Sequence, residues 1–396
     1  MCSFTKIHHY HRQLTIDYYL STINYQPLRT EMTNFIDLTT DGIKELQPYQ
    51  PGKPVEELER ELGLSDVVKL ASNENPLGPS AAVISALQSI LPDIARYPDG
   101  SAFLLKQRLS EHLGVATGQI TVGNGSNDVL ELLAHIYLRP GVEAIVSQHS
   151  FVVYPTVIKS CGAQLTVIPA KNYSQDLGAT LEAITDTTRM IFIANPNNPT
   201  GTWLTRVELT SFLHKVRGDI IVVLDEAYFE YATDPDYPDG IELSKIFPNL
   251  VITRTFSKAY GLAALRVGYS VSHPDIADLM NRIRQPFNVN SMSLVAAVAA
   301  LDDQSHVKEA IALNNEGMRF LEGECKRLGL EYIPSAGNFL TIDMGRDALP
   351  VYDALLQEGV IVRPIAVYEM ANHLRVTTGT MLENQRFVDS LEKVLG

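Results

Sequence analysis

The sequence contains little cysteine: only three of its 396 residues, Cys2, Cys161 and Cys325, and these lie far apart. They form no Cys-x-x-Cys pair, and no histidine stands near them at zinc-ligand spacing. This pattern argues against a disulfide framework and against a structural zinc site. We therefore expect the protein to work in a reducing compartment, the cytoplasm.

Positive charge and long apolar runs are also scarce. The chain carries 32 Lys and Arg against 46 Asp and Glu, a formal net charge of −14. This balance disfavours nucleic acid or an anionic membrane as a partner, so an anionic ligand must be held by a few placed residues. Apolar stretches such as 220–224 and 294–301 fall short of the roughly 20 residues that cross a bilayer. The first residues lack the apolar centre of a secretory signal.

The composition is typical of a globular protein, with 45% hydrophobic and 20% charged residues. Residues 1–31 differ from the rest, with many Tyr, Thr and His and no sustained period. We expect them to be a disordered extension, or an addition from an upstream start codon with Met32 as the functional start. His8, His9 and His11 have no accompanying carboxylate or thiol cluster, so we expect no metal site.

Short β-rich apolar runs alternate with longer segments of helical period. Such strands, apolar on both faces and separated by helices, predict an α/β domain with a mostly parallel central sheet flanked by helices. The C-terminal pattern predicts a smaller α+β domain. The seven runs of the large domain are 119–122, 144–147, 164–168, 190–194, 220–224, 250–253 and 266–271.

These patterns divide the chain after the extension into three parts. Residues 32–80 are predicted to form an N-terminal arm that contributes to the small domain. Residues 81–285 are predicted to form the large domain, and residues 286–396 the small C-terminal domain.

Polar signatures follow several of the predicted strands, at the edge where open α/β sheets bind ligands. The first strand leads into GNGSND (123–128) and then a helix. Glycines and a serine at a helix N-terminus offer backbone N–H groups to an anion. A dinucleotide-binding fingerprint would need a third glycine where Asp128 stands, so an NAD site is disfavoured.

Three later strands also end in chemically active side chains. NPNNPTG (195–201) is a loop whose prolines restrict the backbone and fix the direction of Asn198. Asp225 ends a buried strand, where a carboxylate is costly unless a cation pairs with it. Lys258 stands in an apolar, small-residue stretch, where desolvation would lower its pKa and make it nucleophilic.

In order and spacing, NPNNPTG, DEAY and SKAYGLAALRVG resemble the signatures of the fold-type I pyridoxal-phosphate (PLP) aminotransferases. The resemblance runs from about Ile36 to the C-terminus. Four segments resemble the histidinol-phosphate aminotransferases within that superfamily: NENPLGPS (73–80), RYPDG (96–100), GNGSND and LRVTTGT (374–380).

The resemblance implies a role for each candidate. Lys258 would form the Schiff base with PLP and shuttle a proton, and Asp225 would pair with the protonated pyridine nitrogen. Tyr228 and Asn198 would hydrogen-bond the phenolic oxygen, and Phe151 would stack on the ring. The residues implied at the cofactor phosphate are Gly125, Ser126, Asn127, Thr255, Ser257, Arg266 and, from the neighbouring subunit, Tyr97.

On the substrate side, the resemblance implies that Arg375 grips the phosphate of histidinol phosphate or the carboxylate of glutamate. Arg363 would be a second phosphate contact, and Asn75 is a further candidate. The implied protein is a homodimer with composite active sites that transaminates imidazole-acetol phosphate with glutamate in histidine biosynthesis. An aromatic amino-acid aminotransferase, a phosphothreonine-type decarboxylase and a non-catalytic ligand-binding regulator remain alternatives. The regulator is disfavoured because no helix-turn-helix or basic segment precedes the complete catalytic set.

Overall fold

The computed structural model describes residues 34–48 and 52–396. The predicted N-terminal extension and its three histidines, His8, His9 and His11, lie outside the described residues. Across the described ranges, no helix is both long and apolar enough to span a membrane. Those ranges also contain no group of three His, Cys, Asp or Glu side chains placed to hold a metal ion.

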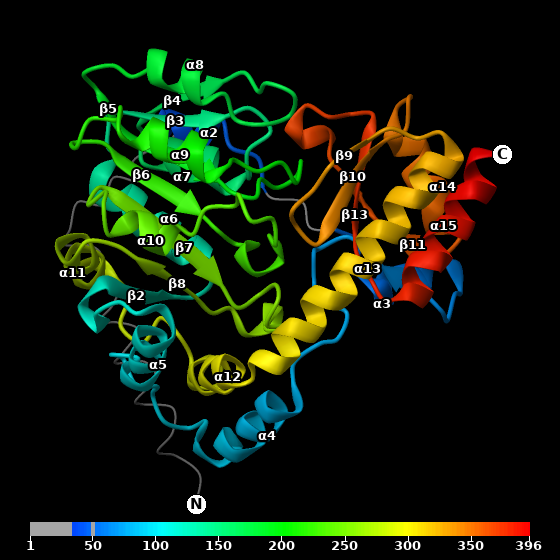
Figure 1. The fold of residues 1–396 in the computed structure, drawn as a ribbon, viewed down its shortest axis with the longest axis horizontal. Helices are drawn as coiled ribbons and strands as arrows, with labels where there is room; N and C mark the ends of the chain where they lie inside the picture. The colour runs from blue at the N-terminus through cyan, green and yellow to red at the C-terminus, as the bar shows by residue number, and fades with distance from the viewer. Residues whose placement is uncertain (1–33, 49–51) are drawn as a thin grey trace, which may run out of the picture.

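The larger part of the molecule is built on a seven-stranded sheet, on the left of Figure 1. Its strands are β2 (Ile120–Gly123), β3 (Glu143–Ser147), β4 (Gln164–Ile168), β5 (Thr188–Ala194), β6 (Ile221–Asp225), β7 (Leu250–Thr255) and β8 (Gly268–Val271). Their spatial order is β2-β8-β7-β6-β5-β3-β4. The pairs from β7 to β4 are parallel, whereas β8 is antiparallel to both of its neighbours. The mostly parallel sheet predicted from the sequence is confirmed.

Helices cover both faces of this sheet because its central strands are apolar on both sides. On β6, Ile221 and Val223 belong to one core, whereas Val222 and Leu224 belong to the core on the other face. The first core includes residues of α6 (Ser126–Tyr137), α7 (Val153–Ser160) and α11 (Pro274–Ile283). The second includes residues of α4 (Ala81–Ile90), α5 (Phe103–Leu113), α8 (Leu177–Glu182), α9 (Arg206–Leu213), α10 (Gly240–Ser244) and α12 (Ser291–Asp302). Each fully buried aliphatic side chain contributes roughly 1.5–3 kcal/mol to stability.

A smaller α+β unit lies on the right of Figure 1. Its antiparallel sheet has the order β12-β13-β10-β9 and shares a core with three helices. The elements are α13 (Gln304–Leu328), β9 (Tyr332–Ile333), β10 (Phe339–Asp343), α14 (Ala348–Gln357), β12 (Arg363–Pro364), β13 (His373–Thr377) and α15 (Met381–Leu395). The N-terminal segment joins this unit through β1 (Val68–Lys69), which pairs in parallel with β11 (Val360–Ile361).

The long helix α13 connects the two parts (Figure 1). It starts directly after α12, which packs against α4 and α5 beside the large sheet. It ends at Gly329, whose positive φ of 70° suits glycine at a helix C-terminus. The remaining short elements are η1 (Phe35–Leu38), α2 (Asp41–Lys44), α3 (Val55–Leu62), η2 (Leu91–Asp93), η3 (Thr117–Gln119), η4 (Phe229–Tyr231), η5 (Ala263–Leu265) and η6 (Ala366–Tyr368).

The carboxyl ends of β5, β6 and β7 lie side by side. Ala194 pairs in register with Asp225, and Asp225 with Thr253. The loops that follow these strands therefore meet at one edge of the sheet, as parallel pairing requires. The strand predicted at 266–271 starts only at 268, because Arg266 has a left-handed φ of 54°.

Candidate active site

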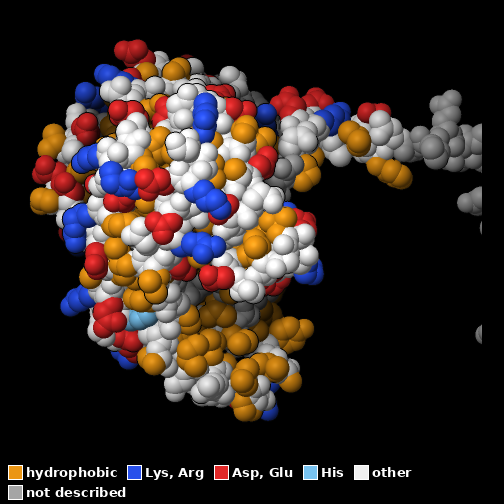
Figure 2. All heavy atoms as spheres, turned by 90° about the vertical axis from the view of Figure 1, so that its right-hand side faces the viewer, with side chains coloured by type: hydrophobic (Ala, Val, Ile, Leu, Met, Phe, Trp, Pro, Cys, Tyr) orange, Lys and Arg blue, Asp and Glu red, His pale blue; other side chains and the backbone are white. Residues whose placement is uncertain are grey.

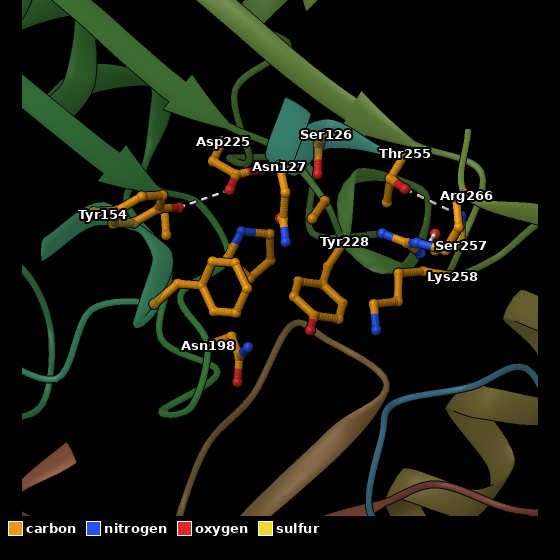
Figure 3. A pocket seen from close by; sticks show the side chains of 14 residues that line it. Ser126, Asn127, Tyr154, Asn198, Asp225, Tyr228, Thr255, Ser257, Lys258 and Arg266 are labelled. Atoms are coloured by element: carbon orange, nitrogen blue, oxygen red, sulfur yellow. Dashed lines mark hydrogen bonds between the residues drawn. The ribbon is translucent and has the colours of Figure 1, made fainter. Parts of the chain in front are cut away.

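Most of the predicted site residues line one cavity of about 150 Å³ at this edge of the large sheet (Figure 3). They come from the start of α6, the loop between β3 and α7, the loop after β5, the ends of β6 and β7 with the loops that follow them, and the turn before β8. The predicted residues in the lining are Ser126, Asn127, Phe151, Asn198, Asp225, Tyr228, Thr255, Ser257, Lys258 and Arg266.

Asp225 provides a buried carboxylate at one end of the cavity. It is only 5% exposed, and burial raises the pKa of its carboxyl group. Two hydrogen bonds oppose that effect: the Tyr154 hydroxyl donates to Oδ2 at 2.7 Å, and the Thr253 hydroxyl donates to Oδ1 at 3.0 Å. Because both bonds favour the ionised form, Asp225 is suited to hold a cationic group in the cavity.

Lys258 provides an amine in the lining, on the side of Ser257 and Arg266 (Figure 3). Its Nζ donates to the Ser72 carbonyl at 3.0 Å and lies 5.6 Å from the centre of the Tyr228 ring. Burial, helped by the positive charge of Arg375, lowers the pKa of Lys258 to about 7. A large share of the amine is therefore neutral near pH 7, and neutral amines are nucleophilic.

Tyr228 and Asn198 both present a hydrogen-bond donor to the cavity. The Tyr228 oxygen accepts from Asn73 Nδ2 at 2.8 Å, which leaves its own proton to donate elsewhere. Asn198 Oδ1 accepts from Arg375 Nη1 at 2.5 Å, which leaves the Asn198 Nδ2 group for the cavity. Arg375 also donates to the Ala71 carbonyl at 2.6 Å. The arrangement suits a ligand oxygen that carries negative charge.

The other end of the cavity is built to hold an anion. Ser126 and Asn127 open α6, whose first N–H groups and dipole favour negative charge. Arg266 Nη1 donates to Ser257 Oγ at 3.1 Å, so a cation and a hydroxyl stand together. Gly125 leaves space that this end requires, because a Cβ there would lie 2.5 Å from Arg266 Nη2. This donor set fits a phosphate group.

A buried ion pair on the opposite face of the sheet ties the ends of β6 and β7 together. Arg254 alternates along β7 with Thr253 and Thr255, so it points away from the cavity. Its Nη2 lies 2.8 Å from the Glu226 carboxylate and 2.8 Å from that of Asp239. The pair holds the two strand ends that carry cavity residues.

Five predicted residues lie outside this lining: Gly125 and Arg375, which are described above, and Asn75, Arg363 and Tyr97. Asn75 donates to the Ala259 carbonyl at 2.9 Å and accepts from the Leu77 N–H at 3.0 Å, so its amide holds its own loop against the loop that follows β7. Arg363 stands on β12 opposite Arg375 on β13 and lines a separate cavity. Tyr97 is 82% exposed and stacks on Phe287 with ring centres 4.8 Å apart.

Three residues that contact the site were missed by the sequence reasoning. Tyr154 follows Phe151 by three residues on the first turn of α7, and Thr253 precedes Thr255 by two on the same face of β7. Once Phe151 and Thr255 are predicted as site residues, helical and strand periodicity indicate Tyr154 and Thr253 as well. No local sequence pattern indicates that Asn73 contacts Tyr228, because the two residues lie 155 positions apart in sequence.

The chain is similar to known proteins over most of its length. The family model for aminotransferase class I and II matches residues 65–391. The chain is 55% identical over 364 residues to histidinol-phosphate aminotransferase 2 of Pseudomonas fluorescens, covering 91% of this chain and 98% of that protein. It is also 55% identical over 363 residues to histidinol-phosphate aminotransferase 1 of Idiomarina loihiensis, covering 92% and 99%.

The fold is also similar to that of a solved structure. Histidinol-phosphate aminotransferase from Sinorhizobium meliloti, in complex with pyridoxal-5′-phosphate, superimposes with a TM-score of 0.83 at 30% identity. The match covers 90% of this chain and 97% of the other. The predicted fold type I is confirmed.

Proposed function

Because the chain belongs to the class I and II aminotransferase family, we propose that it is a PLP-dependent histidinol-phosphate aminotransferase. It transfers the amino group of glutamate to imidazole-acetol phosphate, which yields histidinol phosphate and 2-oxoglutarate in histidine biosynthesis in the cytoplasm. One observation carries the proposal: a nucleophilic lysine, a buried carboxylate and an anion site face the same cavity. The 55% identity to named relatives over nearly their whole length supports the choice of substrate.

The donor set of the cavity fits PLP from end to end. When bound, PLP supplies an aldehyde that takes up the amino group and a ring that withdraws electrons from the reacting carbon. Arg266, Ser257, Thr255 and the start of α6 would hold its phosphate, with Gly125 allowing the close approach.

Other residues would orient the ring and move protons. Asp225 would keep the proton on the ring nitrogen, and Phe151 would lie against the ring face. Tyr228 and Asn198 would donate to the phenolic oxygen. The Lys258 amine would hold the cofactor and, as a neutral base, would take the proton from the substrate carbon that bears the amino group.

Arg375 would bind the anionic group of either substrate. It is a buried guanidinium beside Asn198, and a guanidinium matches the planar fork of a carboxylate or phosphate. Arg363, its neighbour across the β12–β13 pair, would be the second phosphate contact. The engaged amide of Asn75 favours a role in holding its loop over direct contact with substrate.

Single-turnover kinetics test the substrate assignment. We expect histidinol phosphate to discharge the visible absorption of the PLP enzyme with a kcat/KM on the order of 10²-fold or more above phenylalanine and aspartate, because a site built for a phosphate loses buried pairing without it. A preference for phenylalanine would favour an aromatic aminotransferase. Formation of carbon dioxide without amino-group transfer to 2-oxoglutarate would favour a decarboxylase.

The lowered pKa of Lys258 predicts how PLP binding depends on pH. Below pH 7 the amine is a cation and unreactive, so capture of the PLP aldehyde by cofactor-free protein slows as pH falls through 7. We expect a rise of about tenfold in the rate from pH 6 to pH 8, then a plateau. Stopped-flow absorbance measures it. A rise that continues to pH 10 would show an ordinary lysine pKa.

We also propose that the protein is a homodimer with composite active sites. Hydrophobic side chains gather on the lower part of the face in Figure 2, the part where Figure 1 places α4. Around this region a cavity of about 360 Å³ lies between α12 and residues 90–105. The exposed hydrophobic residues in and beside it are Ile84, Leu91, Ile94, Tyr97, Phe103 and Leu104. Since Tyr97 lies outside the cofactor cavity of its own chain, it is available to the partner's site.

Subunit mixing tests this proposal. Lys258→Ala and Tyr97→Ala chains, each nearly inactive alone, should form mixed dimers in which one site carries both lesions and the other carries neither. Random reassortment makes about half of the dimers mixed, so roughly a quarter of the sites should regain activity. Wild-type chains put through the same exchange serve as the control. No recovery after verified exchange would place Tyr97 in its own subunit's site.

A further inference from the structure

A group that donates to the Tyr228 oxygen directs the Tyr228 proton toward a different acceptor. A tyrosine hydroxyl can donate or accept, so its position alone does not decide which it does. The group that reaches this oxygen is the Asn73 side chain, with Nδ2 2.8 Å from Oη. Asn73 is 1% exposed and comes from the loop that precedes α4.

The orientation of the Asn73 amide is itself decided by Thr377. The backbone N–H of Asn73 donates to Thr377 Oγ1 at 2.9 Å, and a backbone N–H can only donate. The Thr377 hydroxyl keeps its own proton while it accepts this bond, and it donates that proton to Asn73 Oδ1 at 3.1 Å. With Oδ1 occupied as the acceptor, the Nδ2 end faces Tyr228. All three residues are buried, so water cannot reverse these bonds cheaply.

The backbone supports this chain of hydrogen bonds at both ends. Asn73 has a left-handed φ of 55°, a conformation that asparagine tolerates better than most residues. Its carbonyl accepts from Asn338 Nδ2 at 3.1 Å. Thr377 is the last residue of β13, and its N–H donates to the Leu70 carbonyl at 2.8 Å. The small sheet thus holds the threonine hydroxyl in place.

We propose that Thr377 and Asn73 are positioning residues that force the Tyr228 hydroxyl to donate into the cofactor cavity. Each group donates a hydrogen bond to the next: the Asn73 backbone N–H to the Thr377 hydroxyl, that hydroxyl to the Asn73 side-chain oxygen, and the Asn73 side-chain nitrogen to Tyr228. Neither Thr377 nor Asn73 lines the cavity, so both act through the tyrosine. Arg375, two residues before Thr377 on the same face of β13, occupies the acceptor atom of Asn198 in the same manner. Two residues of β13 therefore determine that Tyr228 and Asn198 each present a hydrogen-bond donor to the cavity.

This inference rests on the proposed PLP chemistry, and its test uses the PLP enzyme without substrate, so a wrong substrate assignment leaves the result unaffected. The measurement is the apparent pKa of the visible absorption change in a spectrophotometric titration. A donor to a negatively charged oxygen favours the deprotonated form. Losing the Tyr228 donor should therefore raise this pKa.

Thr377→Val keeps the shape of the side chain but removes the hydroxyl, so the amide of Asn73 is free to turn. We expect the apparent pKa to rise by about one unit, a tenfold change in the equilibrium. Thr377→Ser, which retains the hydroxyl, should keep the parent value. Asn73→Gly, which removes the amide and accepts the positive φ, should shift the pKa in the same direction as Thr377→Val.

A double-mutant cycle with Tyr228→Phe separates positioning from a merely structural role. Tyr228→Phe alone should raise the apparent pKa, and adding Thr377→Val should raise it no further. The proposal is overturned if Thr377→Val leaves the pKa unchanged, if Thr377→Ser shifts it as much, or if the valine shift persists in the Tyr228→Phe background.

Discussion

Lys258→Ala is expected to abolish turnover while PLP still binds. The variant lacks both the covalent attachment and the amine that moves the proton, and proton transfer by a positioned group is itself worth about 10²–10⁴-fold. The anion site formed by Arg266 and the start of α6 is separate from Lys258 and should retain the phosphate. Absorption spectroscopy should show the characteristic visible band lost, and equilibrium dialysis should show bound cofactor.

Lys245→Ala is a matched control for that experiment. Lys245 is a half-exposed lysine paired with Glu242 on the surface, so its loss should change neither the spectrum nor the rate. Normal turnover by Lys258→Ala would remove Lys258 from the mechanism. Loss of PLP from the variant would show that the phosphate site alone does not retain the cofactor.

Asp225→Asn is expected to be nearly as damaging, although the side chain keeps its shape. A neutral amide cannot hold the proton on the ring nitrogen, so the ring draws electrons from the substrate carbon less strongly. Removing one preorganised electrostatic contact typically lowers kcat by about 10²–10³-fold. Steady-state and single-turnover kinetics with glutamate should place the loss in kcat.

The environment of Asp225 adds a further expectation for this variant. Tyr154 and Thr253 donate to the two carboxylate oxygens, so an amide would direct its N–H₂ group at one of these hydroxyls. Asp278→Asn serves as the control, since Asp278 forms an exposed i,i+4 pair with Arg282. Wild-type rates in Asp225→Asn would refute the assignment of Asp225 as the partner of the ring nitrogen.

The sequence predicted the strands of the large sheet well because they are buried on both faces. Met190 and Phe192 face one core, and Ile191 and Ile193 face the other, so β5 reads as a continuous apolar run. The same property conceals strand direction. The antiparallel orientation of β8 was therefore not predictable from its composition, since a strand apolar on both faces looks alike in either direction.

The prediction of the site depended on the same geometry. Asn198, Asp225 and Lys258 each follow a strand, and parallel strands bring their carboxyl ends to one edge. Asn75 and Arg363 come from segments outside that sheet, where strand order says nothing about what faces the cavity. The roles of the site residues in catalysis stay predictions until the variants are measured.

The sequence by itself determined which side chains stand at the strand ends and which chemistry they offer, because both follow from local pattern and residue type. Only the tertiary structure decided the state in which those side chains act. The pKa of Lys258 falls to about 7 because packing removes water from its amine. The Tyr228 hydroxyl is directed by Asn73 and Thr377, which lie 304 residues apart in sequence. Desolvation and hydrogen-bond direction depend on which groups the fold brings into contact, and local sequence carries no record of those contacts.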